Sequence, residues 1–446
     1  MMPPSENGWA DNKYSIMMST IVAPCTPAGG ALGVLRISGP EAIQRTSPLF
    51  HPMSGAPLTQ RPGYSLVFGH LMDGDEVLDE VMVSVFRAPH SFTGEDVVEI
   101  SCHGSQYIIQ RAMQLLVAAG CQMARPGEFT QRAFLNGKMD LSRAEAVADL
   151  IAAQNAAQHR VALSQMRGGI SRKLAALREQ LLHLTTLLEL ELDFSDHEDL
   201  EFADRTEIQH VANAIAAEIS RLTDSFAAGN AIKNGIPVAI IGAPNVGKST
   251  LLNQLLQDEK AIVSDIQGTT RDTIEDTFVL EGTLFRLIDT AGIRHTDDRI
   301  EQLGIERSLA AAAHAQIIIL MNEPGVPFSE IPTRKDQTII RLTNKTASFQ
   351  AINGIGLPWL HEQLLKASPV SQNNNEVLIT NLRHKEALDK AHQDITQVLN
   401  ALAQNIPSDL VSEDLRACLH HLGEILGEIT DNEILGNIFS HFCVGK

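Results

Sequence analysis

The first third of the chain alternates short apolar runs with Gly and Pro turns. β-branched residues dominate four of these runs, at residues 21–22, 34–37, 81–85 and 97–100, and predict strands. Apolar residues then recur with helical spacing over about residues 105–119 and predict a helix. We therefore interpret residues 19–136 as a mixed α/β domain. Residues 1–18, which also lack the apolar core of a signal peptide, are expected to form a disordered tail.

A helical pattern fills residues 137–232 and returns in residues 371–446. Ala and Leu dominate the first stretch, and apolar residues recur every three or four positions, as at Leu177, Leu181, Leu184 and Leu188. Such spacing is typical of the buried face of a helix, so these leucines are expected to form the core of a bundle. The economical interpretation is one helical domain in two halves.

Strands and helices alternate between residues 233 and 370. The pattern predicts strands at about residues 238–241, 278–280, 284–288, 316–320 and 338–342, and helices at about 250–256, 300–313 and 357–366. This alternation is typical of a doubly wound α/β domain. The predicted fold class is therefore mixed, with an N-terminal α/β domain, a discontinuous all-α domain and an inserted doubly wound domain.

Residues 242–249, Gly-Ala-Pro-Asn-Val-Gly-Lys-Ser, lie between the first strand and the first helix of this inserted domain. Strand, Gly-rich turn and helix form the context that a phosphate-binding loop (P-loop) requires, which argues against a chance match. The glycines allow successive backbone N–H groups to face one anion, and the helix adds its positive N-terminal end. Lys248 is expected to reach the β- and γ-phosphates, and the Ser249 hydroxyl to bind Mg²⁺.

Two further motifs follow in the order typical of P-loop GTPases. Residues 268–272 are Gly-Thr-Thr-Arg-Asp, and Asp-Thr-Ala-Gly follows an apolar strand at residues 289–292. An Asp at the end of a buried strand suits a Mg²⁺ water contact, and Gly292 supplies a backbone amide that senses the γ-phosphate. Thr269 or Thr270, in a loop upstream, completes the Mg²⁺ shell. Together the three parts predict a GTPase.

The base-reading motif is incomplete. GTPases of this kind use Asn-Lys-x-Asp, whose Asp accepts two hydrogen bonds from guanine, whereas this chain has Ala347 at the Asp position. A hydrogen bond to a charged group is worth about 1.5–3 kcal/mol, so its loss weakens guanine preference roughly 10- to 150-fold. Gln350, before Ala351, also replaces the Ser of the second base-contacting motif. The preferred base is therefore open.

Three polar residues interrupt the N-terminal domain. Arg36 lies within an apolar strand, Glu95 within the polar stretch 91–96, and Lys138 at the end of the stretch 127–138. Each by itself is compatible with an ordinary surface ion pair. Together they are also able to line a polar pocket.

Composition narrows the possible functions. The net charge of −19 argues against a surface covered with nucleic-acid-binding groups, although a local basic groove is compatible with it. The five cysteines are scattered without metal-site spacing, which favours a reducing cytoplasm and argues against a zinc site. No apolar run approaches the ~18 residues of a membrane helix. We expect a cytoplasmic protein without a membrane span.

Taken together, these motifs resemble those of the MnmE (TrmE) family of tRNA modification GTPases, over about residues 19–446. The resemblance is carried by the inserted GTPase domain and by four short motifs: Leu-Arg-Ile-Ser-Gly at 35–39, Thr-Gly-Glu-Asp-Val at 93–97, Arg-Pro-Gly-Glu-Phe-Thr at 125–130 and the terminal Phe-Cys-Val-Gly-Lys at 442–446. It implies a folate-binding and dimerising domain at residues 19–136, helical halves at 137–232 and 371–446, and a G domain at 233–370.

The resemblance also implies a reaction. With a flavoprotein partner, MnmG, in a heterotetramer, the family adds an aminomethyl or carboxymethylaminomethyl group to C5 of the wobble uridine (position 34) of certain tRNAs. A 5,10-methylene- or 5-formyl-tetrahydrofolate supplies the one-carbon unit. The folate contacts implied by position are Arg36, Glu95, Lys138 and Lys446.

The family further implies K⁺ where other GTPases use an arginine finger, and G domains of two subunits that meet on GTP binding. The implied K⁺ ligands are Asn245, Ser264, Ile266 and Thr269, and the implied Mg²⁺ ligands are Ser249 and Thr270. Glu301 matches the glutamate that orients the attacking water, and it joins Lys248 as an implied catalytic residue. Without the resemblance, the favoured interpretation of Glu301 is a first-turn helix residue stabilised by the helix dipole. The implied nucleotide contacts are Asn245, Val246, Gly247, Lys248, Ser249, Thr250, Ser264, Asp265, Ile266, Gln267, Gly268, Thr269, Thr270, Asp289, Thr290, Ala291, Gly292, Asn344 and Lys345.

The main interpretation is therefore a K⁺-stimulated, Mg²⁺-dependent GTP hydrolase that acts in wobble-uridine modification. Two alternatives stay open. The first, favoured by Ala347, is a nucleotide-gated scaffold with relaxed base specificity or weak hydrolysis. The second is a ribosome-assembly GTPase, against which the acidic chain and the lack of a recognisable RNA-binding module argue.

Overall fold

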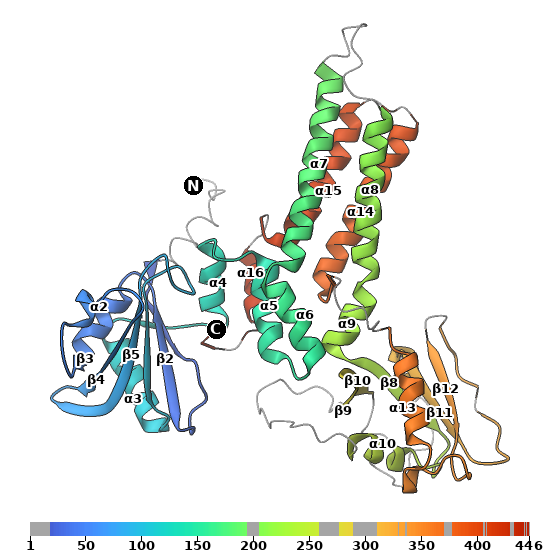
Figure 1. Cartoon of the computed structure of the whole chain (residues 1–446), viewed down its shortest axis with the longest axis horizontal. Helices are drawn as coiled ribbons and strands as arrows, with labels where there is room; N and C mark the ends of the chain where they lie inside the picture. Colours follow the sequence, from blue (N-terminus) through green and yellow to red (C-terminus); the bar gives the residue numbers. More distant parts are fainter. Residues whose placement is uncertain are drawn as a thin grey trace, which may run out of the picture. The chain divides into compact units, whose positions relative to one another are not determined.

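A computed structural model describes most of the chain (Figure 1). The described residues are 18–193, 205–257, 276–288, 310–328, 330–334, 337–369, 377–404, 406, 408–428, 432–440, 442, 444 and 445. They belong to two compact units. The N-terminal unit comprises Met1–Ala148, Met166–Arg172 and His420–Lys446, and the central unit comprises Asp149–Gln165 and Lys173–Leu419. The predicted tail falls almost entirely on residues 1–17, outside the described part.

A seven-stranded sheet forms the centre of the N-terminal unit, in the order β3-β4-β5-β6-β2-β1-β7. Its strands are β1 (Ile21–Pro24), β2 (Leu32–Ser38), β3 (Phe50–Pro52), β4 (Ser65–Asp73), β5 (Glu76–Phe86), β6 (Val97–His103) and β7 (Gln122–Met123). Neighbouring strands are antiparallel except for β1 and β7. The four predicted runs are strands, as expected, but the sequence pattern missed β4. Its inward positions include Gly69, where a Cβ would lie 2.3 Å from the carbonyl oxygen of His51.

The two faces of this sheet differ. Ile109, Ala112 and Leu116 of helix α3 (Gln106–Ala118) share one buried cluster with strand residues such as Val83 and Ile100. Burying each large side chain contributes about 1.5–3 kcal/mol. The short helix α2 (Ala42–Thr46) adds to the same cluster. On β4 the alternate positions Leu66 and Phe68 are exposed, so this end of the opposite face carries apolar surface.

The C-terminal residues of the chain pack in the N-terminal unit. Leu435 and Phe439 of α16 (Asn432–Ser440) form a buried cluster with Phe442 and with Leu141, the first residue of α5 (Leu141–Ala152). Helix α4 (Glu128–Leu135) contacts α16. Its cap residue, Gly127, has a φ of 67°, and a Cβ there would lie 2.7 Å from the carbonyl oxygen of Phe439. Glycine is thus required both by the backbone conformation and by this close approach.

The helical part of the central unit contains long amphipathic helices. They are α6 (Ala156–Met166), α7 (Gly169–Asp193), α8 (Arg205–Asp224), α9 (Phe226–Asn234), α14 (Leu382–Ala403) and α15 (Ser408–Leu426). The beginning of α7 and the end of α15 belong to the N-terminal unit. Helices α8 and α14 pack together, although they are far apart in the sequence. The four leucines predicted as a core seam on α7, at positions 177, 181, 184 and 188, are all buried.

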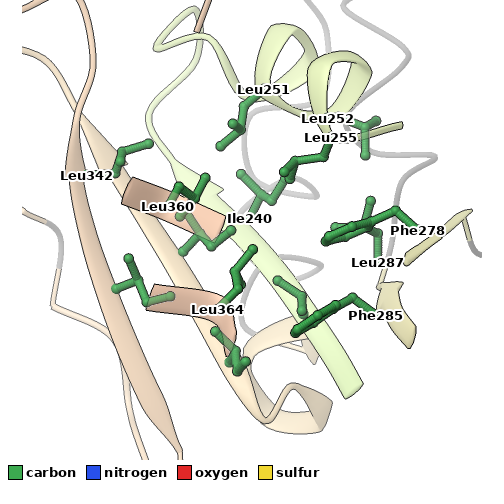
Figure 2. Close-up of a cluster of buried hydrophobic side chains, with 14 of the residues drawn as sticks. Ile240, Leu251, Leu252, Leu255, Phe278, Phe285, Leu287, Leu342, Leu360 and Leu364 are labelled. Carbon is green, nitrogen blue, oxygen red and sulfur yellow. The ribbon is translucent and has the colours of Figure 1, made fainter. Parts of the chain in front are cut away.

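The inserted domain is a five-stranded sheet in the order β12-β11-β8-β10-β9. Its elements are β8 (Ile236–Gly242), α10 (Lys248–Gln257), β9 (Asp276–Leu280), β10 (Thr283–Leu287), β11 (Ile317–Asn322), β12 (Thr338–Thr343) and α13 (Leu357–Lys366). Only β9 is antiparallel to its neighbour. Leucines of α10 and α13 pack on this sheet beside Phe278 and Phe285, whose rings stack 5.2 Å apart (Figure 2). The expected doubly wound pattern is confirmed. Of the helix predicted at 300–313, only residues 310–313 are described, and they are helical.

Candidate functional site

The P-loop lies between β8 and α10, at the carboxyl edge of the inserted sheet. Strand β8 is parallel to both of its neighbours, β10 and β11, and its residues 238–241 are buried. Leu251, Leu252 and Leu255 bury one face of α10 against the same core. The N-terminal end of α10 is therefore fixed where parallel α/β sheets bind ligands, outside the carboxyl ends of their strands.

Two residues of the loop have a left-handed backbone. Asn245 has a φ of 62° and Gly247 a φ of 101°. Its φ favours glycine at position 247, and a Cβ there would also lie 2.4 Å from the side-chain nitrogen of Asn344. Asparagine tolerates the left-handed region better than most residues, which explains its presence at the tip of the loop.

Lys248, the first residue of α10, folds back over this loop. Its ammonium nitrogen donates to the carbonyl oxygens of Gly242, at 2.7 Å, and Ala243, at 2.8 Å. Burial lowers the pKa of Lys248. Its ammonium group lies over the turn where the loop amides and the helix N-terminus favour an anion. Ser249 follows in the first turn of α10, and a hydroxyl at this place suits Mg²⁺, which prefers oxygen ligands.

Asn344 connects the base-reading segment to the P-loop. It is almost fully buried, donates to the carbonyl oxygen of Val246 at 2.8 Å and accepts from the backbone N–H of Ala351 at 3.0 Å. Lys345 has a φ of 61°, and its ammonium lies 2.5 Å from a carboxylate oxygen of Glu323. The P-loop, the base-reading segment and Glu323 therefore meet at one edge of the sheet. The first two of these carry predicted nucleotide contacts.

Many predicted nucleotide contacts lie outside the described residues. They are Ser264, Asp265, Ile266, Gln267, Gly268, Thr269, Thr270, Asp289, Thr290, Ala291, Gly292 and Glu301. The proposed catalytic glutamate, three K⁺ ligands and one Mg²⁺ ligand are among them. Among the residues that the structure does describe, no group of three or more His, Cys, Asp or Glu side chains is arranged to hold a metal ion.

A second polar site lies in the N-terminal unit around Arg36. The guanidinium of Arg36 lies 2.8 Å from a carboxylate oxygen of Glu99 and stacks over the rings of Phe92 and Phe129, each 5.7 Å away. It also donates to the carbonyl oxygen of Gly445 at 3.5 Å, and Gly445 accepts from the thiol of Cys25 as well. The tertiary structure thus brings the C-terminal motif to Arg36. Lys446 itself lies outside the described residues.

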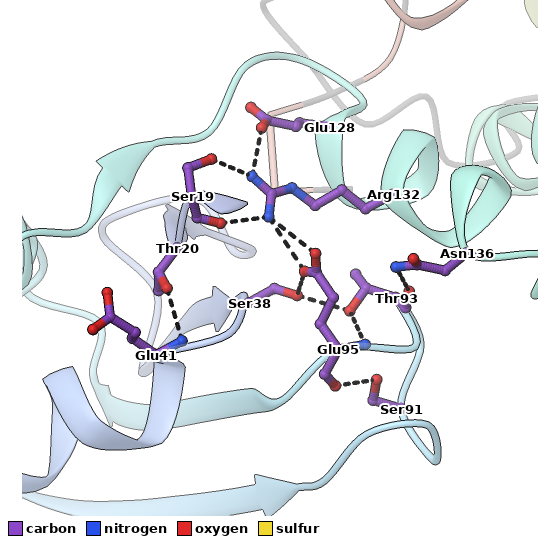
Figure 3. A network of polar contacts seen from close by, with 10 residues as sticks. All are labelled: Ser19, Thr20, Ser38, Glu41, Ser91, Thr93, Glu95, Glu128, Arg132 and Asn136. Carbon is purple, nitrogen blue, oxygen red and sulfur yellow. Dashed lines mark hydrogen bonds and ion pairs between the residues drawn. The ribbon is translucent and has the colours of Figure 1, made fainter. Parts of the chain in front are cut away.

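Glu95 lies in a buried polar network (Figure 3). Its carboxylate accepts from the hydroxyl of Ser38 at 2.6 Å and from Arg132 at 3.1 Å. Arg132 is completely buried and also donates to Glu128, at 3.0 Å, and to the backbone oxygen of Ser19, at 2.7 Å. Burial raises the pKa of Glu95, against the lowering effect of Arg132. The guanidinium of Arg132 therefore forms ion pairs with two buried carboxylates, those of Glu95 and Glu128.

Sequence reasoning missed Arg132. The signal was present, because Arg132 lies three residues after Phe129 and one before Ala133, both fully buried, and so falls on the apolar face of α4. A charged residue in that position requires buried partners. Glu95 and Glu128 are those partners.

One loop, residues 88–96, connects the three predicted folate contacts. Its Phe92 lies under Arg36, Glu95 belongs to it, and its Pro89 carbonyl oxygen accepts from the ammonium of Lys138 at 2.9 Å. Asn136 also donates to the loop, at the carbonyl oxygen of Thr93, 2.7 Å away. The structure therefore brings Arg36, Glu95 and Lys138 to one neighbourhood, although about 40 to 60 residues separate each from the next along the chain.

Fold and site together define a P-loop GTPase domain inserted into a helical domain. A sequence model described as the MnmE helical domain matches residues 141–443, and one described as the GTP-binding protein TrmE N-terminus matches residues 20–138. The chain belongs to the MnmE family of tRNA modification GTPases. It is a GTP hydrolase of tRNA modification, and the family's chemistry requires GTP and Mg²⁺.

Relatives carry the same description along the whole chain. The tRNA modification GTPase MnmE of Parabacteroides distasonis is 51% identical over 96% of this chain and 100% of its own length. That of Bacteroides fragilis strain YCH46 is 50% identical over 96% and 99%, and that of Flavobacterium psychrophilum is 47% identical over 97% and 100%. A solved structure of Era from Aquifex aeolicus bound to GDP·AlF₄⁻ is 23% identical over 35% of this chain and 65% of its own, but its TM-score of 0.22 carries no argument. No helix in the described part is long and apolar enough to cross a bilayer.

Proposed function

We propose that this GTPase is K⁺-stimulated and that, with the flavoprotein MnmG, it adds an aminomethyl or carboxymethylaminomethyl group to C5 of the wobble uridine, position 34, of tRNAs. The observation that carries the proposal is the neighbourhood formed by loop 88–96. It combines a buried carboxylate, two cationic side chains and two aromatic rings with the C-terminal motif. A GTP switch alone does not require such a combination of residues in the N-terminal unit.

A 5,10-methylene- or 5-formyl-tetrahydrofolate fits the chemistry of this neighbourhood. The folate supplies the one-carbon unit when it is bound. Glu95 offers a carboxylate acceptor for N–H donors of the pteridine, and the rings near Arg36 offer apolar surface. Arg36, Lys138 and Lys446 offer positive charge to carboxylates of the glutamyl tail. Arg132 and Ser38 would hold Glu95 in place for this contact.

In the nucleotide site, Lys248 and the loop amides would bind the phosphates, and Ser249 and Thr270 would hold Mg²⁺. Glu301 would orient the attacking water. We propose Asn245, Ser264, Ile266 and Thr269 as the K⁺ ligands. The left-handed backbone of Asn245 supports its part, because it places an amide side chain at the tip of the P-loop rather than in the core.

We further propose a cytoplasmic homodimer that joins MnmG in a heterotetramer. The exposed Leu66 and Phe68 on β4 support a self-association surface on the N-terminal sheet. Neighbouring exposed apolar side chains often mark a protein–protein interface.

Two measurements test the proposal. In a deletion strain that expresses this chain, mass spectrometry of wobble uridines is expected to show restored modification, and unchanged uridines would refute the tRNA role. GTP hydrolysis at saturating GTP is expected to be faster in K⁺ than in Na⁺. Equal rates in the two salts would refute the K⁺ assignment.

Ala347 favours a second candidate, a site with relaxed base specificity. Ala347 is exposed in the base-reading segment, directly after Thr346, whose hydroxyl lies 3.0 Å from that of Ser348. Hydroxyls are able to accept from guanine or donate to other bases, whereas an Asp only accepts. Calorimetry with GTP, ITP and ATP distinguishes a GTP-specific site from one with relaxed base specificity. A strong preference for GTP would exclude relaxed specificity.

A further inference from the structure

A short segment of the central unit has an unusual place in the chain. Asp149–Gln165, which comprises the end of α5 and nearly all of α6, belongs to the central unit. The chain before it, up to Ala148, and the short stretch after it, Met166–Arg172, belong to the N-terminal unit. The segment is therefore joined covalently, at both of its ends, to the unit that carries Arg36 and Glu95. A displacement of the segment is passed on to that unit through these two connections.

The inserted G domain is joined to the helical part by two links that run close together. The first comprises the end of α9, Lys233 and Asn234, and enters β8 at Ile236. The second returns through Leu378, Ile379 and Thr380 to α14. The second link lies against the start of α9, because the N–H of Ile379 donates at 3.1 Å to the hydroxyl of Ser225, the residue before the helix. Gly229 on α9 approaches so closely that a Cβ there would lie 2.2 Å from the carbonyl oxygen of Ile379.

Two glutamines of α6 each hold one of these links. The amide of Gln158 donates to the carbonyl oxygen of Lys233, on the first link, at 2.9 Å. The amide of Gln165 donates to the carbonyl oxygen of Leu378, on the second link, at 3.0 Å, and to the hydroxyl of Thr380 at 3.1 Å. Seven residues are about two helical turns, so both glutamines project from one face of α6.

Each amide is also held at its oxygen or by burial. The side-chain oxygen of Gln158 accepts from the N–H of Gln154 at 2.7 Å, and Gln165 is only 5% exposed. An ion pair adds to the first link, since Lys233 lies 2.8 Å from a carboxylate oxygen of Asp149 on α5. The backbone of each link is thus recognised by a side chain on the segment that leads into the other unit.

A cavity of about 130 Å³ lies among these contacts. Its lining includes Asp149, Gln158, Gln165, Lys233 and Thr380, together with small residues such as Ala162. A pocket of this volume is well below the ~300–1,000 Å³ typical of sites for small-molecule ligands.

We propose that Gln158 and Gln165 are positioning residues that couple the nucleotide state of the G domain to the N-terminal unit. A displacement of the two links pulls on α6 through their carbonyl oxygens. Segment Asp149–Gln165 then transmits the displacement to α5 and to the chain after Met166. This inference rests on GTP hydrolysis and on the wobble-uridine role proposed above, but not on the folate or K⁺ assignments.

The test separates hydrolysis from modification. The double variant Gln158→Met, Gln165→Met keeps side-chain length and removes both donors, while Gln180→Met, at an exposed position of α7, is the matched control. In the double variant, GTP hydrolysis is expected to stay at the wild-type rate and wobble-uridine modification in a complemented deletion strain to fall about tenfold. The control is expected to match wild type in both. If the double variant modifies tRNA as well as wild type, or if its hydrolysis falls in parallel, the proposal is wrong. Failure of wild type itself would refute the proposed function instead.

A second measurement needs no variant. Amide hydrogen exchange of the full-length protein is compared with GDP and with a non-hydrolysable GTP analogue. Protection of residues 154–165 and 378–381 is expected to change together between the two states. Equal protection in both states would overturn the coupling role, even if the double variant did not fold.

Discussion

The side-chain amide of Asn344 lies 2.8 Å from the carbonyl oxygen of Val246, to which it donates. This single contact joins the base-reading segment to the P-loop. Since its oxygen also accepts from the N–H of Ala351, Asn344 holds three chain segments at one edge of the sheet. The segment predicted to read the base and the P-loop are therefore joined by a buried hydrogen bond.

Replacing Asn344 tests this contact. Asn344→Ala leaves a buried acceptor at Val246 and a buried donor at Ala351, each of which costs about 1–3 kcal/mol. GDP affinity measured by calorimetry is expected to fall at least about tenfold. Asn353→Ala is the matched control, because this exposed amide contacts only Gln350 among the described residues. Equal affinities of the two variants would contradict the structural role of Asn344.

Ala347→Asp is expected to strengthen guanine recognition. The new carboxylate gains hydrogen bonds from guanine N1–H and from the exocyclic amine, each about 1.5–3 kcal/mol. GTP affinity is expected to rise roughly tenfold or more, and ITP affinity, which lacks the amine contact, to rise less. Ser348→Asp, one position along and equally exposed, is the control. A GTP affinity that stays unchanged would show that the base is read elsewhere.

Gly127→Ala is expected to loosen the C-terminal residues. Both Gly127 and Gly137 are left-handed, with φ of 67° and 68°, but only at Gly127 does a Cβ meet Phe439, while at Gly137 nothing lies within 4 Å. The left-handed penalty of about 1–2 kcal/mol is thus common to both alanine variants. Overpacking adds about 1–3 kcal/mol at Gly127 alone.

Thermal unfolding and limited proteolysis of the C-terminal residues compare the two alanine variants. Gly127→Ala is expected to melt at a lower temperature and to lose its C-terminal residues to protease sooner. Equal behaviour of both variants would show that α16 does not depend on this contact.

The Glu95 network predicts a pH dependence of stability. Burial raises the pKa of Glu95, so the folded protein binds its proton more tightly than the unfolded chain does. The resulting stabilisation is fully present below the unfolded pKa of about 4.3 and is lost as pH rises through the higher folded pKa. As pH rises from the unfolded pKa of Glu95 through its folded pKa, the free energy of unfolding of the wild type is therefore expected to fall relative to that of Glu95→Gln. Denaturant titrations between about pH 4 and pH 7 measure it. Parallel curves for the two proteins would contradict the raised pKa.

Local pattern was sufficient for much of the fold. The β-branched runs before residue 101 form strands, the four leucines of α7 are buried, and residues 236–257 form the strand, turn and helix of a P-loop. These features depend on side-chain periodicity and on glycine, which act within a few residues along the chain. Strand β4 was missed because Gly69 and His70 interrupt its pattern, and the reason for Gly69 is the neighbouring strand β3.

By itself the sequence determined the kind of chemistry: a phosphate loop, a Lys and a Ser at its end, and a base-reading Asn without its Asp. Only the tertiary structure decided which distant residues act together. It placed Gly445 beside Arg36, supplied Arg132 as the partner of Glu95, and put Gln158 and Gln165 on the two links of the G domain. Contacts of this kind join residues from about 37 to more than 400 positions apart, and they depend on which buried charges and carbonyl oxygens find partners once the chain is folded.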